Sequence, residues 1–405
     1  MAAQHPPSER SSLRPGRVLA TTLTVLGLAA LVVWLAPADR LGVSSLDLRV
    51  YRGAAEAMLA GRDLYGFGIA DVNGAATFLY PPFAALLAVP TTWLPLGSVI
   101  TAWLIVQFAL AAIVVGTLLW YSGRARCRGL ADVTSVVGVG ALFVFSRPVM
   151  MGLHLGQVSL LVTTLVVIDL LLLPRRWQGI LIGIAGAIKL TPLFFVVFLL
   201  GCRRWRAAAA AIATFLAASV VGFLLLPAES ATYWTTVVFD SGRVPGFNSE
   251  RNLGLLGVLT FWSEQAAWVK PLWILAGAAL AAAALGRAVR HHRRGERVEA
   301  VVVVGLGATV LSPVAWDHFY VWLVVAALHL ALGNSRFRPM GWGLVAAVSL
   351  ASPIWPAALF PPGFVHLAVI PCLAATTLMV VGLPAGHERS GASLPTRAEP
   401  ELAAT

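Results

Sequence analysis

Residues Ile180–Leu200 read ILIGIAGAIKLTPLFFVVFLL, an apolar run in which Lys189 is the charged side chain. About 20 consecutive apolar residues are long enough to cross the hydrocarbon core of a bilayer as a helix. Pro192 has no backbone N–H and frees a carbonyl one turn earlier, so it predicts a break close to Lys189. The run is therefore either a spanning helix or a re-entrant segment that enters the membrane and returns while buried in protein.

Runs of this kind recur along the chain. Of the 405 residues, 59% are hydrophobic and 12% are charged, and the mean hydropathy is +0.83. This composition excludes an ordinary soluble domain and predicts an all-α polytopic membrane protein, with an uncleaved first helix at Val18–Leu35. The further apolar segments are Phe78–Leu96, Val99–Tyr121, Val133–Met150, Leu155–Leu173, Ile180–Leu200, Ala207–Leu226, Pro271–Leu285, Val298–Leu311, Phe319–Leu332, Gly341–Trp355 and Val365–Val381. Together they predict about twelve crossings.

The net charge of +11 comes from short basic clusters beside these runs. Such clusters follow the positive-inside rule of membrane proteins and do not form a nucleic-acid-binding face. We expect residues 1–17, Arg203–Arg206 and His291–Arg297 to be cytoplasmic, and the loops 38–78 and 227–267 and the turn Ser312–His318 to be outside.

Strict alternation of the crossings violates this rule in two places, because it puts Arg124–Arg128 and the pair Arg175 and Arg176 outside. About ten crossings with two re-entrant segments, at Phe78–Leu96 and Ile180–Leu200, is the alternative. In both alternatives residues 18–384 form one transmembrane catalytic domain, and residues 385–405 form a disordered tail. The three cysteines are far apart and imply no disulfide framework or metal motif.

The longest polar stretch between apolar runs is Ser45–Phe83, SLDLRVYRGAAEAMLAGRDLYGFGIADVNGAATFLYPPF. Its first part predicts an amphipathic helix that lies along the membrane surface and holds Asp47 and Tyr51 on one face. Arg52 and Glu56 pair at i,i+4, and Gly61 ends the helix. The ordinary alternative is that Asp47 is only a favourable charge at a helix N-terminus.

Ionisable groups inside membrane segments indicate function, because their burial is costly. Lys189 is expected to meet an anionic lipid head group, and the alternative is a lysine whose ammonium snorkels to the interface. His318 can donate to a phosphate or a sugar hydroxyl, and Asp317 precedes it; interfacial anchoring is the alternative. His154 and Gln157 are one helical turn apart, with Gly156 between them leaving room for another backbone.

The late outer loop offers Arg243 for a phosphate and Asn248 for a sugar hydroxyl, although a loop cap explains either residue equally well. Tyr65 and Tyr80 are aromatic residues on which a sugar can stack, and an interfacial belt is the alternative. Nucleotide-binding, zinc-protease and DxD nucleotide-sugar motifs are absent from the sequence. This absence favours a sugar donor that is already in the membrane.

These residues carry a family resemblance over nearly the whole chain. The chain resembles the polyprenol-phosphate-mannose-dependent α-1,2-mannosyltransferases of actinobacteria, in the GT-C superfamily. The resemblance rests on Asp47-Leu48-x-Val50-Tyr51, Leu64-Tyr65-Gly66, Tyr80-Pro81-Pro82-Phe83, Gly156-Gln157, Lys189-Leu190-Thr191-Pro192, and Ser312-Pro313 with Trp316 and His318. Two positions depart from the family pattern: Asn248-Ser249-Glu250 replaces Asn-Gln-Ser, and His318-Phe319 replaces a pair of histidines.

The resemblance implies a GT-C-type fold of about 10–12 transmembrane helices whose active site faces the outer side of the cell membrane. It implies transfer of mannose from polyprenyl-phosphate-mannose to a glycolipid, either a phosphatidylinositol mannoside or lipomannan, with inversion, no metal and no separate cofactor. Asp47 falls on the catalytic carboxylate. The expected substrate-binding residues are Arg49, Tyr51, Tyr65, Tyr80, His154, Gln157, Lys189, Arg243, Asn248, Asp317 and His318.

Chemistry agrees with this expectation, because a sugar on a lipid phosphate already has a good leaving group. The reaction then needs one base for the acceptor hydroxyl and cations that balance the phosphate. A transporter or flippase for a lipid-linked saccharide is the main alternative, and it has no need of a carboxylate in an outer loop. A structural scaffold for other cell-wall enzymes leaves Lys189 unexplained.

Overall fold

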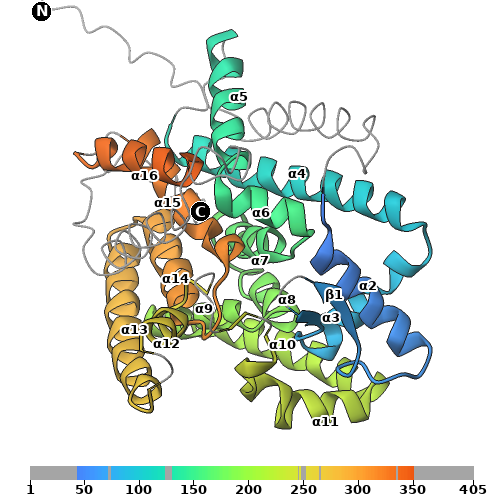
Figure 1. Cartoon of the computed structure of the whole chain (residues 1–405). Coiled ribbons are helices and arrows are strands. Elements are labelled where there is room, and N and C mark those ends of the chain that lie inside the picture. The colour runs from blue at the N-terminus through green and yellow to red at the C-terminus, as the bar shows by residue number, and fades with distance from the viewer. Residues whose placement is uncertain are drawn as a thin grey trace, which may run out of the picture.

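The computed structural model describes residues 43–71, 74–123, 130–244, 246–247, 252–263, 266–333 and 336–350. Several predictions lie outside these residues: the first helix, both tails, the segment Val365–Val381 and the cluster Arg124–Arg128. Within them the chain is helical apart from one antiparallel hairpin, whose strands β1 (Gly68–Asp71) and β2 (Gly74–Thr77) pair Gly68 with Thr77. The predicted all-α class is confirmed (Figure 1).

The helices follow the apolar runs closely, but many are short. They are α2 (Leu46–Leu59), α3 (Pro82–Ala88), α4 (Leu96–Tyr121), α5 (Leu130–Val144), α6 (Arg147–Leu155), α7 (Ser159–Val167), α8 (Ile180–Ile188), α9 (Phe194–Gly201), α10 (Trp205–Leu225), α11 (Pro227–Thr235), α12 (Leu255–Trp262), α13 (Val269–Arg293), α14 (Arg297–Leu311), α15 (Val321–Leu332) and α16 (Arg338–Leu350). A 3-10 turn, η7 (Asp317–Tyr320), precedes α15.

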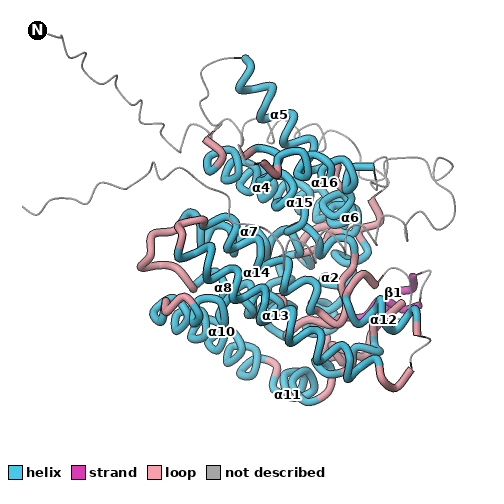
Figure 2. The backbone as a smooth tube through the Cα atoms, turned by 90° about the vertical axis from the view of Figure 1, so that its left-hand side faces the viewer, coloured by secondary structure: helices cyan, strands magenta, loops and turns pink. Residues whose placement is uncertain are grey.

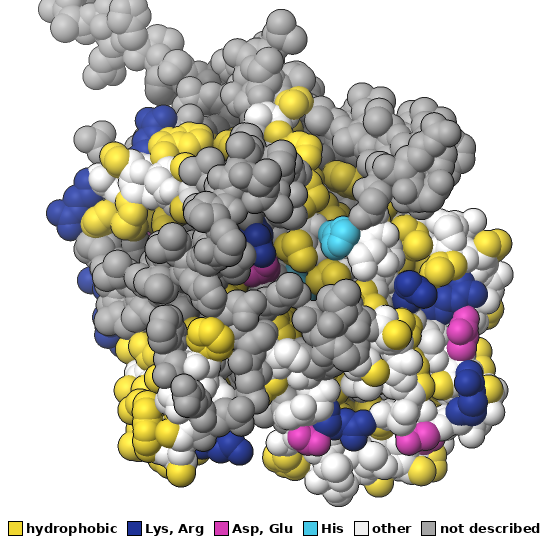
Figure 3. All heavy atoms as spheres, in the orientation of Figure 1, with side chains coloured by type: hydrophobic (Ala, Val, Ile, Leu, Met, Phe, Trp, Pro, Cys, Tyr) yellow, Lys and Arg dark blue, Asp and Glu magenta, His cyan; other side chains and the backbone are white. Residues whose placement is uncertain are grey.

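Three of the described helices, α4, α10 and α13, are long and apolar enough to cross a membrane. Residues Val136–Val144 of α5 and α6 together are also apolar enough, but the pair bends by 65°, as in a broken span or a re-entrant loop. The outward sides of α10 and α13 carry exposed leucines, valines, isoleucine and phenylalanine, among them Leu224 and Leu275. Figure 3 shows apolar side chains gathered at the lower left of the molecule, over α13. Lipid is the natural solvent of such a surface, whereas the number of full crossings stays a prediction.

The run Ile180–Leu200 forms a helical hairpin and not a spanning helix. Arg204 donates a hydrogen bond to the Gln178 side chain, so the two ends of the run meet. Gly179 faces the Ala207 carbonyl oxygen, and four residues later a Cβ at Gly183 would lie 2.5 Å from the Ala211 carbonyl oxygen. Because the contacts advance along both helices in the same direction, α8 runs parallel to α10. α9 must therefore return to the end where α8 began, with Lys189 at the tip. This is the chain path that the re-entrant alternative predicts, and its placement in a membrane stays a prediction.

A helix of this length reaches only part of the way across a bilayer. α8 has 9 residues and α9 has 8, which at 1.5 Å per residue is about 12–14 Å, under half of the roughly 30 Å hydrocarbon core. α8 ends at Ile188, and Lys189 adopts an extended conformation (φ −150°, ψ 128°). The break thus exposes backbone groups at membrane depth, inside the protein and not in lipid.

The basic residues at the base of this hairpin gather on one end of the molecule. Arg175 and Arg297 lie close enough to Arg204 for electrostatic repulsion. The positive charges of all three arginines also disfavour a charged His292. Arg297 also donates to the Leu170 carbonyl oxygen at 2.6 Å. Arg175 therefore shares the end of the predicted cytoplasmic cluster His291–Arg297, which removes one of the two conflicts with the positive-inside rule.

The run Phe78–Leu96 also fails to form a spanning helix. Its helix α3 has 7 residues and is followed by a 3-10 turn, Val89–Thr92. α3 packs against α2 and against the last turns of α10, where a Cβ at Gly222 would lie 3.7 Å from the Phe83 nitrogen. The segment therefore stays at the end opposite the basic cluster, as the re-entrant alternative predicts.

Exposed tryptophans mark both ends of the molecule. Trp177 and Trp205 flank the base of the hairpin and are 52% and 61% exposed, while Trp93 and Trp268 lie at the other end and are 73% and 54% exposed. Indole rings favour the level of the lipid head groups. The two pairs therefore predict one interface at the basic end and the other at the end near α2; Figure 2 shows α2 on the side of the molecule opposite the loops next to α7, α8 and α10.

The polar stretch folds at its start as predicted. α2 has Asp47 in its first turn, and Arg52 pairs with Glu56 at 2.7 Å. Gly61 adopts φ +64° beyond the helix and its N–H bonds the Met58 carbonyl, which ends α2 as expected. The β1–β2 hairpin was not predicted. That α2 lies along a membrane surface stays a prediction.

The return of α9 to the base of the α8–α9 hairpin predicts that Trp177 and Arg294 are on the same side of the membrane and that Arg62 is on the other side. In a chain whose three native cysteines are replaced by alanine, a membrane-impermeant maleimide added to intact cells should label Arg62→Cys and leave Trp177→Cys and Arg294→Cys unlabelled. All three positions should react after the cells are permeabilised. External labelling of Trp177→Cys would instead mean that Ile180–Leu200 crosses the membrane.

Candidate functional site

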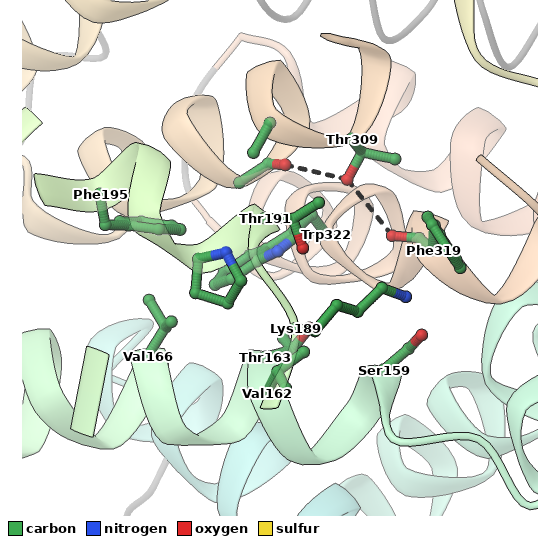
Figure 4. Close-up of a pocket in the computed structure, with 13 residues that line it drawn as sticks. Ser159, Val162, Thr163, Val166, Lys189, Thr191, Phe195, Thr309, Phe319 and Trp322 are labelled. Carbon is green, nitrogen blue, oxygen red and sulfur yellow. Dashed lines mark hydrogen bonds between the residues drawn. The ribbon is translucent and has the colours of Figure 1, made fainter. Parts of the chain in front are cut away.

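Lys189, at the tip of the α8–α9 hairpin, is the centre of the candidate site. Its side chain is 9% exposed, and the ammonium nitrogen lies 3.2 Å from the centroid of the Phe319 ring and 5.9 Å from that of Tyr80. Figure 4 shows the ammonium pointing between Phe319 and Ser159. No hydrogen bond or ion pair between Lys189 Nζ and another described residue accompanies these ring contacts. Two aromatic rings and the electrostatic attraction of Asp47 stabilise the ammonium, but no described residue forms a direct ion pair with it, so it retains its capacity for an anion.

Phe319 occupies the position where the family resemblance leads to a second histidine. The substitution replaces a group that can donate a hydrogen bond with an apolar ring that faces the ammonium directly. His318 therefore remains as the only histidine of this pair.

Asp47 brings a carboxylate to the same place. It lies in the first turn of α2, is partly exposed, and interacts electrostatically with Lys189, Tyr51 and Tyr80. The Ser45 N–H donates to the His154 carbonyl at 2.8 Å, and this bond ties the start of α2 to the end of α6. Backbone contacts thus fix the helix turn that carries the Asp47 carboxylate, so the carboxylate does not depend on a flexible loop for its position.

Gly156 allows this close approach. It adopts φ +70°, and a Cβ there would lie 2.7 Å from Leu48 Cβ. The prediction that Gly156 admits another backbone is confirmed, and the backbone is that of α2. The predicted helical pairing of His154 with Gln157 is wrong, however, because α6 ends at Leu155 and Gly156 breaks the helix between them.

Tyr51, Tyr80 and Gln157 form a buried hydrogen-bond network behind Asp47. Tyr51 donates to Gln157 Oε1 at 2.8 Å, and Gln157 Nε2 donates to the Tyr80 hydroxyl at 3.1 Å. The Val158 N–H donates to the same Oε1 at 2.9 Å. Burial raises the pKa of Tyr51 well above its usual value, and the neighbouring Tyr80 and Asp47 raise it further. The phenol therefore stays protonated, and the network joins α2 to the α6–α7 junction.

His318 reaches the site from η7. It is 3% exposed, and its Nε2 has no hydrogen-bond partner in the part of the chain that the structure describes. Burial lowers the pKa of His318 well below its usual value, and the nearby Lys189 lowers it further. The imidazole is therefore neutral at physiological pH and serves as a hydrogen-bond donor or acceptor, not as a second cation.

The remaining predicted residues have other partners or lie apart. Arg243 donates to the Tyr65 carbonyl at 2.6 Å, and the Tyr65 hydroxyl donates to the Tyr80 carbonyl at 3.0 Å, so both residues brace the polar stretch. Asp317 pairs with Arg147 at 2.6 Å. Arg49 is exposed on the outer side of α2, and Asn248 lies outside the described residues.

Asn252 is a site-building residue that the sequence analysis missed. Its Oδ1 accepts from the Ala315 N–H at 3.0 Å, and its Nδ2 donates to the Pro313 carbonyl at 3.2 Å. These bonds hold the late outer loop against the turn that carries His318. Nothing in the local sequence distinguished Asn252 from the loop asparagine Asn248, four residues earlier.

No group of three or more histidine, cysteine, aspartate or glutamate side chains among the described residues is arranged to hold a metal ion. The groups that converge are instead a carboxylate, an ammonium, an imidazole and two phenols. This set can accept one proton, balance one anion and hydrogen-bond a polyhydroxylated substrate.

Comparison with known proteins gives a consistent result. Residues 78–314 match the family model described as Glycosyltransferase family 87. The chain is 31% identical to a polyprenol-phosphate-mannose-dependent alpha-(1-2)-phosphatidylinositol mannoside mannosyltransferase of Mycobacterium tuberculosis, over 76% of this chain and 75% of the relative. It is 32% identical to the corresponding phosphatidylinositol pentamannoside mannosyltransferase of Mycolicibacterium smegmatis, over 86% and 85%. No solved structure matches the chain.

The tyrosine network predicts a structural cost when Gln157 is removed. Gln157→Ala leaves the buried Tyr51 and Tyr80 hydroxyls without this partner, and an unsatisfied buried polar group costs about 1–3 kcal/mol. The free energy of unfolding in detergent should fall by about that amount, measured by thermal or denaturant unfolding. Thr101→Ala, which removes an exposed hydroxyl on α4, should change the stability little. Equal stability of the Gln157→Ala variant and the wild type would show that the network does not contribute to the free energy of unfolding.

Proposed function

Because the chain belongs to glycosyltransferase family 87, we propose that it transfers mannose from polyprenyl-phosphate-mannose to a phosphatidylinositol mannoside and forms an α-1,2 linkage with inversion. The observation that carries the proposal is the meeting of Asp47 on α2 with Lys189 at the hairpin tip. Donor and acceptor are taken from the names of the relatives. Membership in a glycosyltransferase family favours this reaction over transport of a lipid-linked saccharide.

Asp47 is the general base in this proposal. A partly exposed carboxylate that interacts electrostatically with the Lys189 ammonium can accept a proton from an acceptor hydroxyl. The backbone bond from Ser45 to His154 and the contact of Leu48 with Gly156 fix the start of α2, so they fix the base relative to the hairpin tip. Such positioning is what general-base catalysis requires.

Lys189 and His318 bind the phosphate end of the donor. The ammonium balances the negative charge on the lipid phosphate, which increases as the bond to the sugar breaks. The neutral imidazole of His318 supplies a hydrogen bond to a phosphate or sugar oxygen. Together they stabilise the leaving group without the need for a strong general acid.

The reaction is a single displacement. The acceptor oxygen forms a bond to the anomeric carbon of mannose while the bond from that carbon to the phosphate oxygen breaks, and the polyprenyl phosphate leaves with the bonding electrons. Asp47 takes the hydroxyl proton. Attack from the face opposite the phosphate converts a β-linked donor into an α-linked product, as a single carboxylate allows in inverting glycosyl chemistry.

We place the reaction at the outer face of a multi-pass cell-membrane protein. The basic residues at the base of the hairpin mark the cytoplasmic end, and Asp47, His318 and the Asn252 loop lie toward the other end. The acceptor reaches Asp47 from that side. A phosphatidylinositol mannoside fits because its sugars are outside the bilayer while its acyl chains stay in the membrane.

The role of Asp47 predicts that Asp47→Asn lowers the turnover by about 10²- to 10⁴-fold, because asparagine has almost the same shape but cannot take a proton. Transfer from labelled polyprenyl-phosphate-mannose to phosphatidylinositol mannosides in proteoliposomes measures this change. Glu56→Gln, a carboxylate change on the exposed side of the same helix, is the matched control and should retain wild-type turnover. Turnover of Asp47→Asn above a tenth of wild type would exclude Asp47 as the base and direct attention to Asp63, Asp71 or Asp317.

The role of Lys189 and His318 predicts a defect in donor use. Lys189→Ala and His318→Ala should each raise the KM for polyprenyl-phosphate-mannose and leave the KM for the acceptor within about twofold, since a hydrogen bond to a charged group contributes about 1.5–3 kcal/mol. Both variants should elute as folded monodisperse protein in detergent. Unchanged dependence on donor concentration in both variants would return these residues to the role of interfacial anchors.

A further inference from the structure

A cavity lies beside Lys189 (Figure 4), and Asp47 is not among the residues that line it. The hairpin tip, α7, α14 and the start of α15 enclose it. Its polar lining consists of the Lys189 ammonium and the hydroxyl groups of Ser159, Thr163, Thr191 and Thr309. Its other walls are apolar, with Val162 and Val166 on α7 and Trp322 on α15.

Ser159 carries a fully buried hydroxyl in the lining of this cavity. Its side chain is 5% exposed, and its Oγ has no hydrogen-bond partner among the described residues. Thr309 donates to the Gly305 carbonyl at 3.0 Å, and Thr164, on the same helix as Ser159, donates to the Leu160 carbonyl at 2.7 Å. Buried hydroxyls are almost always bonded, so an unpaired one that faces a cavity indicates a missing partner.

The chemistry of the cavity identifies that partner. The Ser159 hydroxyl and the Lys189 ammonium are both donors, so the ligand must bring several acceptor oxygens and a negative charge. A neutral sugar would bring no negative charge to the ammonium, which has no direct ion pair with a described residue. A free inorganic phosphate would gain nothing from Val162, Val166 and Trp322, whereas a phosphate ester with a hydrocarbon chain would bury that chain against them.

We propose that Ser159 is a further donor-binding residue, whose hydroxyl hydrogen-bonds the lipid phosphate that Lys189 holds, while the apolar walls of the cavity receive the first carbons of the prenyl chain. This inference rests on the proposed function for the identity of the donor. It assigns the phosphate and the chain to the cavity side of Lys189, and leaves the Asp47 side to mannose and the acceptor. Ser159 lies in the first turn of α7, where unpaired backbone N–H groups and the helix dipole also favour an anion.

The test measures binding of polyprenyl phosphate, which lacks the sugar, to the full-length protein in detergent, by thermal shift and by tryptophan fluorescence. The wild type should bind polyprenyl phosphate, and should bind polyprenol and inorganic phosphate far more weakly at the same concentration. Ser159→Ala should weaken the binding of polyprenyl phosphate about 10- to 100-fold and raise the donor KM by a similar factor, because it removes a hydrogen bond to a charged group.

Two further variants keep the result interpretable. Ser159→Thr retains the hydroxyl and should recover most of the affinity, whereas Ser159→Cys has almost the same size but is a weak donor and should resemble Ser159→Ala. Thr164→Val on the same helix is the matched control, because that hydroxyl bonds within α7 and does not line the cavity. Its affinity should stay within about twofold of wild type.

Wild-type affinity of both Ser159→Ala and Ser159→Cys for polyprenyl phosphate would overturn the inference. Equal binding of polyprenol, or equal competition by inorganic phosphate, would overturn the assignment of a lipid phosphate to the cavity. The binding assay needs no acceptor, so it separates the two proposals. Ser159-dependent binding without mannose transfer would contradict only the proposed function, and transfer with unchanged donor affinity in Ser159→Ala would contradict only this inference.

Discussion

The structure depends on a charge that is held away from water. The Lys189 ammonium is almost wholly buried where α8 ends, beside the faces of Phe319 and Tyr80 and within the electrostatic reach of Asp47. Ring faces offset only part of the cost of removing a cation from water. Because no described residue forms a direct ion pair with the buried ammonium, the hairpin tip favours the binding of an anion.

Two kinds of contact make this arrangement rigid. Close backbone approach is one kind, at Gly156 against Leu48 and at Gly183 against Ala211. Side-chain amides are the other, with Gln157 between two tyrosines and Asn252 between two outer loops. The reacting groups come from segments far apart in the chain, and these contacts hold the segments at fixed distances. Preorganisation of this type lets fixed charges and donors stabilise a transition state without rearrangement.

Local physical signals made part of this molecule predictable. Pro192 beside a lone lysine in an apolar run predicted the break, and Gly61 predicted the end of α2. The β1–β2 hairpin was missed because its strands are short and rich in glycine and alanine, which carry no alternating apolar pattern. The error at His154 and Gln157 arose because Gly156 serves two purposes, a helix end and a close approach, and only the second was considered. Ser159 and Asn252 were invisible in sequence, because the value of their polar atoms depends on which distant groups face them.

The parallel contact of α8 with α10 has a consequence for how the protein is made. α8 leaves the ribosome before α10, yet its glycine face is complementary to alanines near the start of α10 and not to lipid. Until α10 has been synthesised, the half-length hairpin has no surface on which to settle, and its broken tip exposes backbone polar groups that hydrocarbon cannot satisfy. Insertion of this region must therefore wait for about 20–30 residues of later sequence, the length of a spanning helix. A larger side chain at Gly183 would deny the hairpin that surface, because its Cβ would lie 2.5 Å from the Ala211 carbonyl oxygen.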